Sequence, residues 1–225
     1  MQVHEGHKNA RKFFNFKTAS SYDSIVCLTT FGQDFLWKNQ ILSILAKKEN
    51  ILDLACGTGI LSSLLSKSDK RQLMGLDFTF DYLKIAKKKR RNYFLINGNA
   101  ETLPYKSESF DGIMSSYLAK YVNIKLLVEE CWRVLKHNSI IVFHDFTYPH
   151  NVVISSLWNA YFAALKTLGN FVTPWKIVFR ELIKVIRNTN WVEEIVYVLE
   201  KTGFKTISCK FYTMGTAAIV SAKKP

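Results

Sequence analysis

The chain has 225 residues, of which 48% are hydrophobic, and only 4 prolines and 10 glycines. This length and composition predict one large domain with a compact core, and they exclude a long low-complexity linker. The four cysteines form no CxxC pair. Their spacing therefore argues against a zinc site and a disulfide scaffold, and it favours a reduced, cytoplasmic protein.

The formal net charge of +13 predicts contact with anionic ligands or surfaces. Basic residues gather between Lys84 and Arg91 and again at Lys223 and Lys224. A solvated helix end accounts for such a cluster, and a surface for anionic lipid or another polyanion is the alternative. No stretch reaches the roughly 18 apolar residues that span a bilayer, so we expect a soluble protein or one bound peripherally to a membrane.

The first half of the chain predicts alternating strands and helices. Residues 1–20 are expected to be a mobile or loosely docked arm, and residues 21–48 have apolar positions at helical spacing. The strands that follow are continuously apolar, which is typical of a parallel sheet covered on both faces. Strands are predicted at 50–55, 71–78, 92–97, 110–116 and 139–146, and helices at 59–67, 81–91 and 123–136.

The pattern changes after His150. Helices rich in aromatic residues are predicted at 151–171, 175–188 and 191–203, the last with Gly203 as its C-cap. Two strands then follow, at 204–212 and 216–224. We therefore predict an α/β fold with a Rossmann-like, seven-stranded, mostly parallel sheet, an antiparallel closing hairpin, helices on both faces and a helical lid insertion.

The stretch ILDLACGTG, residues 51–59, ends an apolar strand in two glycines two positions apart. Glycines at a strand-to-helix turn let the backbone approach a ligand closely, and the next helix begins with unpaired N–H groups. Asp77 comes about 20 residues after Gly57, at the end of the next strand, where a carboxylate can accept hydrogen bonds from ribose hydroxyls. The pattern predicts a nucleotide-like ligand.

Three classes of nucleotide site compete for this motif. The P-loop pattern GxxxxGK[ST] is absent. A dinucleotide fold prefers GxGxxG, whereas here GTGILS places Ser62 or Ser63 where the third glycine would stand. A site for S-adenosylmethionine needs no pyrophosphate clamp, only the close backbone approach and an acidic residue for the ribose. The residues favour this third class.

Several segments together resemble the class I S-adenosylmethionine-dependent methyltransferases and, within them, the ubiquinone/menaquinone biosynthesis C-methyltransferase family. They are DLACGTG, GLDF, NGNAETLPYKSESFDGI and EECWRVLK, with ASSYDSIVCLTTFGQDFLWKNQIL near the start and GFKTISCKFYTMGTAAIVSAKK at the end. The resemblance implies one methyltransferase domain with S-adenosyl-L-methionine as cofactor. Its parts would be an arm with helices (1–48), the cofactor-binding core (49–150), a helical substrate lid (151–190) and a last helix with the closing hairpin (191–225).

The resemblance also implies which residues bind the cofactor. Asp53 would steady the glycine loop or reach the cofactor's ammonium group. The other expected contacts are Gly57, Thr58 and Gly59 at the methionine end, Asp77 at the ribose, Phe78, Asn99 and Ala100 at the adenine, and Ser116 near the amino-acid part.

Methyl transfer to carbon needs an electron-rich acceptor, which a hydroquinone becomes when a general base removes a hydroxyl proton. The ends of the fourth and fifth strands supply the candidates Tyr117, His144 and Asp145, and Tyr22 is a further one. His144 and Asp145 are neighbours in a strand and point to opposite faces, so at most one of them would act directly. No metal-binding constellation is visible.

The chain departs from the family pattern after the fourth strand. Where the family has Phe-Gly, one residue and Arg-Asn, this chain has Tyr117-Leu118-Ala119-Lys120-Tyr121. Those positions lie near the quinone ring in the family, so another small molecule or lipid stays open as acceptor. RNA is the less favoured alternative, because no appended RNA-binding module is visible.

The resemblance further implies a route for the substrate and a set of partners. The lid would line a channel for a prenyl tail, with ordinary helix packing as the alternative reading of the same aromatic residues. These are Trp158, Tyr161, Phe162, Phe171, Trp175 and Phe179. The expected partners are a membrane-resident prenyl quinol, an anionic membrane surface and a second copy of the chain in a homodimer, without nucleic acid.

Overall fold

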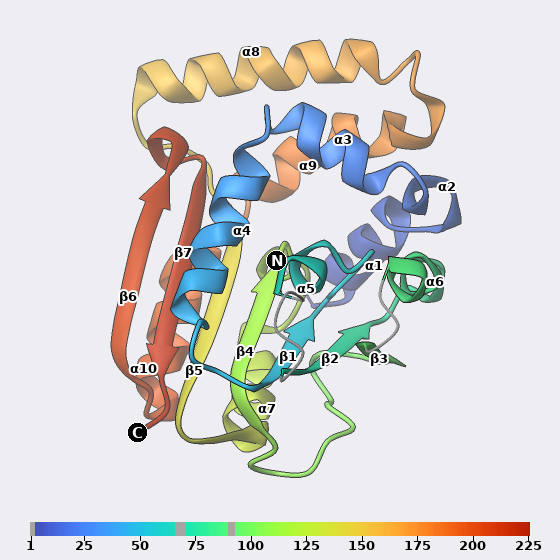
Figure 1. The fold of residues 1–225 in the computed structure, drawn as a ribbon. Helices are drawn as coiled ribbons and strands as arrows, with labels where there is room; N and C mark the ends of the chain where they lie inside the picture. The colour runs from blue at the N-terminus through green and yellow to red at the C-terminus, as the bar shows by residue number, and fades with distance from the viewer. Residues whose placement is uncertain (1–2, 66–70, 90–92) are drawn as a thin grey trace.

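The computed structural model describes residues 3–65, 71–89 and 93–225 (Figure 1). The predicted helix end at Lys67 and the basic residues Arg90 and Arg91 lie outside these ranges. The strands are β1 (Asn50–Leu54), β2 (Gln72–Asp77), β3 (Tyr93–Asn97), β4 (Phe110–Ser116), β5 (Leu135–Phe146), β6 (Lys205–Tyr212) and β7 (Ala217–Lys223). They form one sheet in the order β3-β2-β1-β4-β5-β7-β6, in which only β7 runs antiparallel to both of its neighbours. The predicted seven-stranded sheet with its closing hairpin is confirmed.

The helices are α1 (Val3–Phe13), α2 (Phe16–Ala19), α3 (Tyr22–Thr29), α4 (Gln33–Ile44), α5 (Ile60–Leu65), α6 (Phe80–Lys89), α7 (Ile124–Val134), α8 (Val152–Leu168), α9 (Lys176–Arg187) and α10 (Trp191–Thr202). The helices from α3 to α10 fall on the segments predicted to be helical, whereas α1 and α2 lie in the predicted arm. Short 3-10 turns occur at η1 (Ala119–Tyr121), η2 (Thr173–Trp175) and η3 (Thr213–Gly215). Gly203 ends α10 with a φ of 106°, as predicted for its C-cap.

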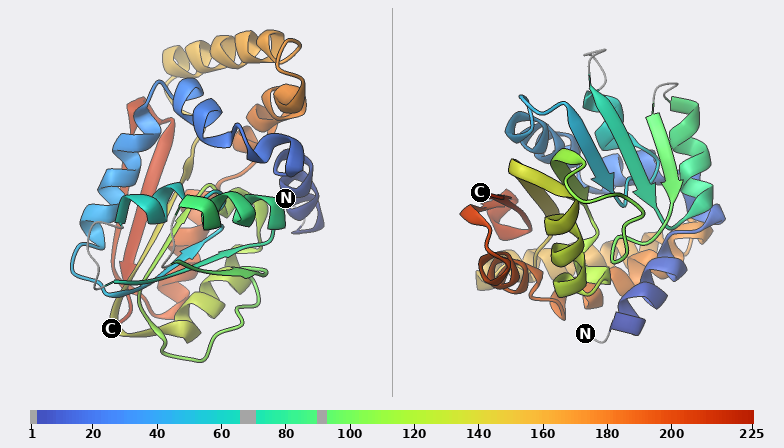
Figure 2. Two further views of the ribbon diagram at one scale, coloured as in Figure 1. Left: turned by 45° about the vertical axis from the view of Figure 1, so that its right-hand side comes forward. Right: turned by 90° about the horizontal axis from the view of Figure 1, so that it is seen from below.

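Each face of the sheet has its own apolar core, and helices cover both faces (Figure 2). On one face α7 and α10 place Leu127 and Ile195 against the strands. On the other face α4 and α6 place Ile41 and Leu83 against them. Strands that are buried on both faces need apolar side chains at every position, which explains their continuous apolar sequence.

A third core lies beyond the carboxyl ends of the parallel strands. There α3, α8, η2 and α9, which we call the lid, close over the end of the sheet (Figure 1). Buried aromatic side chains from three segments meet in this core, including Phe13, Phe162 and Trp175. The lid therefore encloses space directly above the edge at which open α/β sheets bind ligands.

The predicted loose arm at residues 1–20 is wrong. Residues Gly6, Ala10 and Phe13 form a buried stripe on α1, and Phe13 is fully buried. Gly6 lies so close to η1 that a Cβ there would collide with the carbonyl of Tyr121. The spacing of these three residues is helical, but the many charges around them obscure it.

Candidate active site

A cleft of about 890 Å³, partly open to solvent, lies at the carboxyl ends of β1, β2 and β4. It brings together several of the residues predicted from the sequence: Gly57, Asp77, Phe78, Asn99, Ala100 and Ser116, with Tyr117. All seven stand at the last residue of a strand or within three residues after it, so their position in the fold is set by local sequence. The cleft has the place and the donor groups that a nucleoside ligand requires.

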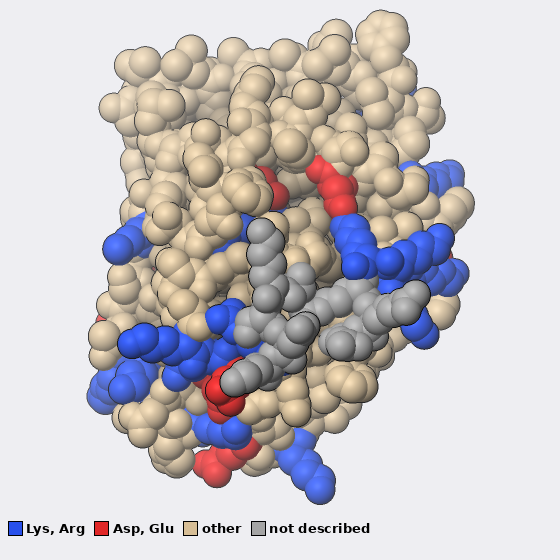
Figure 3. All heavy atoms as spheres, viewed as in Figure 1, with Lys and Arg blue, Asp and Glu red and all other residues tan. Residues whose placement is uncertain are grey.

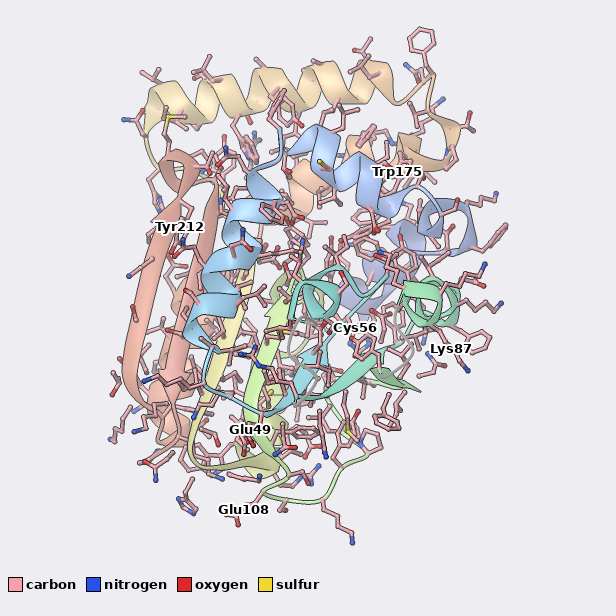
Figure 4. The ribbon with its side chains drawn as sticks, viewed as in Figure 1. Glu49, Cys56, Lys87, Glu108, Trp175 and Tyr212 are labelled. Carbon is pink, nitrogen blue, oxygen red and sulfur yellow. The ribbon has the colours of Figure 1, made fainter. Side chains whose placement is uncertain are left out.

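The glycine turn holds its shape through left-handed backbone angles. Gly57 and Gly59 have φ of 56° and 75°, a region that residues with a Cβ rarely adopt. Ala55, two residues before Gly57, also has a positive φ of 53°. Cys56 lies buried beside this turn at the end of β1 (Figure 4), where burial raises the pKa of its thiol well above the usual value. Its thiol is therefore protonated and unreactive at neutral pH.

Asp77 connects the turn to the next strand. One carboxylate oxygen accepts the N–H of Gly57 at 2.8 Å, and the other accepts the N–H of Thr79 at 2.7 Å. Each oxygen keeps a second lone pair that can accept a hydroxyl. Burial raises the pKa of Asp77 to about 6, and the two backbone hydrogen bonds oppose that rise.

Asp53 does not line the cleft. Its carboxylate points toward α5, accepts the hydroxyl of Ser62 at 2.6 Å, and lies 3.3 Å from the hydroxyl of Tyr93. Ser62 occupies the position where a dinucleotide motif has its third glycine, and here its hydroxyl fixes the start of the helix to β1. Asp53 is therefore placed to steady the glycine turn from behind rather than to contact a ligand in the cleft.

Thr58 and Gly59 also lie behind the cleft surface. The buried hydroxyl of Thr58 donates to Asp23 of α3, which also pairs with Lys89 of α6. A Cβ at Gly59 would approach the Cβ of Ala86 to 3.1 Å, so the turn packs tightly on α6. These two residues contact neighbouring helices instead of the cleft.

Asn99, Ala100 and Phe78 also line the cleft. The amide oxygen of Asn99 accepts the N–H of Glu101 at 3.1 Å, which fixes the side chain in a tight turn. Glu101 in turn pairs with His7 of α1 at 3.0 Å. The first helix is thus tied to the loop that carries Asn99.

The structure adds cleft residues that the sequence reading missed. His7, Arg11 and Phe14 come from the N-terminal segment, and Tyr82 and Tyr121 come from α6 and η1. The placement of the first three depends on the docking of α1, which no local motif indicates. Arg11 brings a cation that can pair with a carboxylate of a bound ligand.

A second cavity, of about 1330 Å³ including the space open to solvent at its mouth, lies beneath the lid. Phe14, Tyr22, Tyr117 and Tyr121 line both this cavity and the first cleft, so the two spaces share one aromatic wall. The lid residues predicted for a substrate channel line it with one exception: they are Trp158, Tyr161, Phe162, Trp175 and Phe179. Phe171 is the exception, because its ring is 83% exposed on the outside of the lid. Figure 4 shows Trp175 on the lid beside α3, where its indole N–H donates to Ser21 at 2.8 Å.

Tyr117 stands at the junction of the two cavities. Its backbone has a positive φ of 67°, which is unusual for an aromatic residue and directs the chain from β4 into η1. Its hydroxyl donates to Asp34 at 2.8 Å, and Asp34 also pairs with the buried Lys38. Burial raises the pKa of the Tyr117 hydroxyl well above its usual value, so the residue stays protonated.

Lys120 is the buried cation of the second cavity among the residues that the structure describes. Its ammonium group pairs with Asp145 of β5, and both side chains are almost completely buried. The rings of Tyr117, Tyr121 and Phe146 surround it, with centroids 5.1–5.5 Å from the nitrogen. Burial lowers the pKa of Lys120 and raises that of Asp145. One oxygen of Asp145 and the hydroxyl of Tyr121 have no hydrogen-bond partner within the described ranges.

His144 and Asp145 point to opposite sides of β5, as the alternation of a strand predicts. The Nδ1 of His144 lies 2.7 Å from the hydroxyl of Ser116, and its ring packs against Trp37 and Tyr117. Burial lowers the pKa of His144 well below its usual value, so its ring is neutral. Neither His144 nor Asp145 lines a cavity directly, whereas Tyr117 lines both.

Because Asp53 is buried, we expect the folded state of the protein to become less stable as the pH rises. Burial raises its folded-state pKa from 3.8 to about 7, so between these values the folded chain binds one proton more than the unfolded chain. The contribution of this extra proton to the free energy of unfolding is fully present below pH 4 and is lost as the pH rises through 7. Asp53→Asn should remove about 2 kcal/mol of the change in unfolding free energy between pH 5 and pH 7. Urea titrations at both pH values test this, and an unchanged pH dependence in the variant would contradict it.

Comparison with known proteins agrees with this geometry. The model of a family described as the ubiE/COQ5 methyltransferase family matches residues 1–224. The ubiquinone/menaquinone biosynthesis C-methyltransferase UbiE of Campylobacter jejuni is 27% identical over 227 residues, covering 95% of this chain and 96% of that protein. The demethylmenaquinone methyltransferase of Thermotoga maritima is 27% identical over 206 residues, covering 88% and 89%.

A solved structure shows the same fold. A methyltransferase from Archaeoglobus fulgidus, described as dependent on S-adenosylmethionine, superposes with a TM-score of 0.65 at 17% identity and covers 90% of this chain and 100% of that one. The family match extends over nearly the whole chain, including the arm, the glycine turn and the closing hairpin. The chain therefore belongs to the ubiE/COQ5 methyltransferase family and is an S-adenosylmethionine-dependent methyltransferase.

Proposed function

We propose that the chain transfers a methyl group from S-adenosylmethionine to a ring carbon of a demethylated prenyl quinol, such as demethylmenaquinol. The observation that carries this proposal is the apolar cavity under the lid, which shares an aromatic wall with the cofactor cleft and contains the buried Lys120. Its size and lining suit a flat ring with a hydrocarbon tail. The names of the relatives from Campylobacter jejuni and Thermotoga maritima support the same substrate class.

The residues of the first cleft fit the cofactor. Asp77 has free lone pairs for the two ribose hydroxyls, and the turn at Gly57 leaves room for the methionine part. Asn99 and Phe78 bound the adenine end, and Arg11 can pair with the carboxylate. Bound there, S-adenosylmethionine supplies an electrophilic methyl group on its sulfonium sulfur.

The residues of the second cavity prepare the acceptor. A quinol ring carbon becomes nucleophilic when a ring hydroxyl gives up its proton. The ammonium group of Lys120 stabilises the phenolate oxygen that forms, in an apolar site where such a charge pair is strong. Asp145 holds Lys120 in place, and because Asp145 lines neither cavity, the proton of the ring hydroxyl would reach it through the ammonium group of Lys120. Tyr117 and Tyr121 shape the passage between the ring and the cofactor cleft.

Peripheral membrane association is part of the proposal. No helix in the described part of the chain is long and apolar enough to cross a bilayer. A prenyl quinol resides in the membrane, and the net charge of +13 favours an anionic lipid surface. A homodimer is the other expected assembly, and sedimentation of the purified chain decides it.

Methyl transfer to defined acceptors tests the proposed function. The full chain is incubated with S-adenosylmethionine carrying a labelled methyl group and with chemically reduced demethylmenaquinol, a phospholipid extract or RNA. We expect label in the quinol, with mass spectrometry locating the new methyl on a ring carbon. Label in the phospholipid or the RNA, with none in the quinol, would overturn the substrate assignment but not the methyltransferase activity.

A further inference from the structure

The outer surface of the lid is unusually apolar. On α8 the exposed residues Val153, Leu157, Ala160, Ala164 and Leu168 recur at helical spacing and form one stripe. The opposite side of the same helix is also apolar, because Phe162 and Leu165 pack into the core. α8 thus has apolar side chains on both its inner and its outer side, with a polar flank between them that includes Ser155, Asn159 and Lys166, and it lies at the edge of the molecule (Figure 1).

Neighbouring segments extend this apolar surface. Leu28 and Phe31 at the end of α3 are 71% and 80% exposed, Phe171 after α8 is 83% exposed, and Met214 in η3 is 71% exposed. We call these four residues and the α8 stripe the lid face. Figure 3 shows the part of the molecule over α8 almost free of charged side chains, while the lysines and arginines gather lower down.

The charges on the lid segment from Phe146 to Arg180 are positive. This segment contains no aspartate or glutamate but three exposed cations, Lys166, Lys176 and Arg180, of which Arg180 pairs with Glu181 at 3.0 Å. An apolar surface with a cationic fringe matches a bilayer with anionic headgroups. Interfaces between proteins are instead depleted in lysine relative to the rest of the surface.

The cavity under the lid opens toward this same face. Phe31, Leu157 and Met214 line the cavity and are each more than 60% exposed, so they form its rim. The ring of Phe31 lies 5.9 Å from that of Tyr161, which lines the interior of the cavity. An apolar tail inside the cavity would therefore leave the protein at the lid face.

We propose that the lid face docks on the surface of an anionic phospholipid bilayer, so that the cavity opens directly into the hydrocarbon region. A prenyl tail could then remain in the lipid while its ring enters the protein. The proposal rests on the function proposed above for the identity of the substrate, but the docking surface itself follows from exposure and charge alone. The basic cluster of α6, which the sequence singled out, lies away from the lid face: in Figure 4 Lys87 is at the side of the molecule.

Vesicle flotation without substrate or cofactor tests the docking surface. The full chain is mixed with vesicles of phosphatidylcholine alone or with added phosphatidylglycerol. We expect binding that increases with the anionic lipid and weakens as salt is added. The double variant Val153→Glu/Phe171→Glu changes two exposed lid residues that line neither cavity, and its partition coefficient should fall at least about tenfold.

A matched control distinguishes the contribution of the lid face to vesicle binding from that of exposed apolar residues elsewhere on the protein. Phe80 of α6 and Phe94 of β3 are 60% and 64% exposed but lie away from the lid, so Phe80→Glu/Phe94→Glu should leave flotation unchanged. Both variants should bind S-adenosylmethionine as the wild type does, which shows that they fold. Equal flotation of the lid variant and the wild type overturns the proposal, as does failure of the wild type to float.

Sedimentation of the same proteins tests whether the lid face binds a second copy of the chain instead of a bilayer. A wild-type dimer that becomes monomeric in the lid variant would mean that the lid face binds another copy, which overturns the lipid assignment. The outcome is independent of the proposed reaction, because flotation needs no methyl acceptor. Methyl transfer to a short-tailed quinol in the absence of vesicles tests that reaction separately.

Discussion

Asp77→Asn should weaken the binding of S-adenosylmethionine at least about 100-fold. The carboxylate of Asp77 accepts the N–H groups of Gly57 and Thr79, and its remaining lone pairs face the cleft. An amide places an NH₂ group against one of those N–H donors and loses one acceptor for the ribose. Two charge-assisted hydrogen bonds of about 1.5–3 kcal/mol each account for such a loss. Isothermal titration calorimetry measures it directly.

The pH dependence of binding gives this prediction a second readout. Burial sets the pKa of Asp77 near 6 in the free protein, and ribose hydroxyls donate to the ionised form. The affinity should therefore be constant above pH 6 and fall toward about tenfold per pH unit below it, because binding then releases a proton. In Asp77→Asn this slope should be absent. Asp81→Asn, on the exposed side of α6, serves as the control and should bind normally.

Binding of Asp77→Asn within threefold of the wild type would remove the ribose assignment. A loss of affinity with an unchanged pH slope would point instead to a general loosening of the glycine turn. Circular dichroism of the variant distinguishes that case from global unfolding. The two readouts together separate the contact with the ligand from the support of the loop.

The cofactor cleft was largely predictable because its residues are encoded locally. Gly57 and Asp77 follow two strands whose ends meet at one edge of any parallel sheet, so their proximity follows from the fold class alone. Asn99 and Ser116 were expected there from the family resemblance, and both line the cleft. Asp53 was harder to place, since the sequence does not say which face of β1 it occupies or that the hydroxyl of Ser62 would donate a hydrogen bond to it.

The substrate side was less predictable because it depends on contacts between distant segments. The first helix joins the site through the packing of Gly6 on η1, which no motif announces. Phe171 belongs to an aromatic-rich helical segment yet faces outward, because it follows the end of α8. The sequence does carry one signal on this side: Lys120 stands where the family pattern has arginine, so a cation is kept while the residue after it changes.

Lys120 should have a large effect on the chemical step. Replacing it with methionine removes the cation of the second cavity, so we expect kcat to fall by about 100-fold or more while the affinity for S-adenosylmethionine stays unchanged. Lys120→Arg keeps the charge and should recover part of the activity. Initial rates with reduced quinol, measured over a range of both substrates, separate kcat from the two KM values.

The buried pair makes stability a necessary control for this experiment. Lys120→Met leaves Asp145 buried without its cation, which costs about 3–5 kcal/mol when such a pair is broken from one side. The double variant Lys120→Met/Asp145→Asn removes both charges and should fold better than the single variant. If Lys120 only supports the fold, the double variant recovers activity together with stability. If Lys120 stabilises the phenolate, the double variant is stable and still slow, because the apolar cavity then has no cation to offset the charge that forms on the ring oxygen.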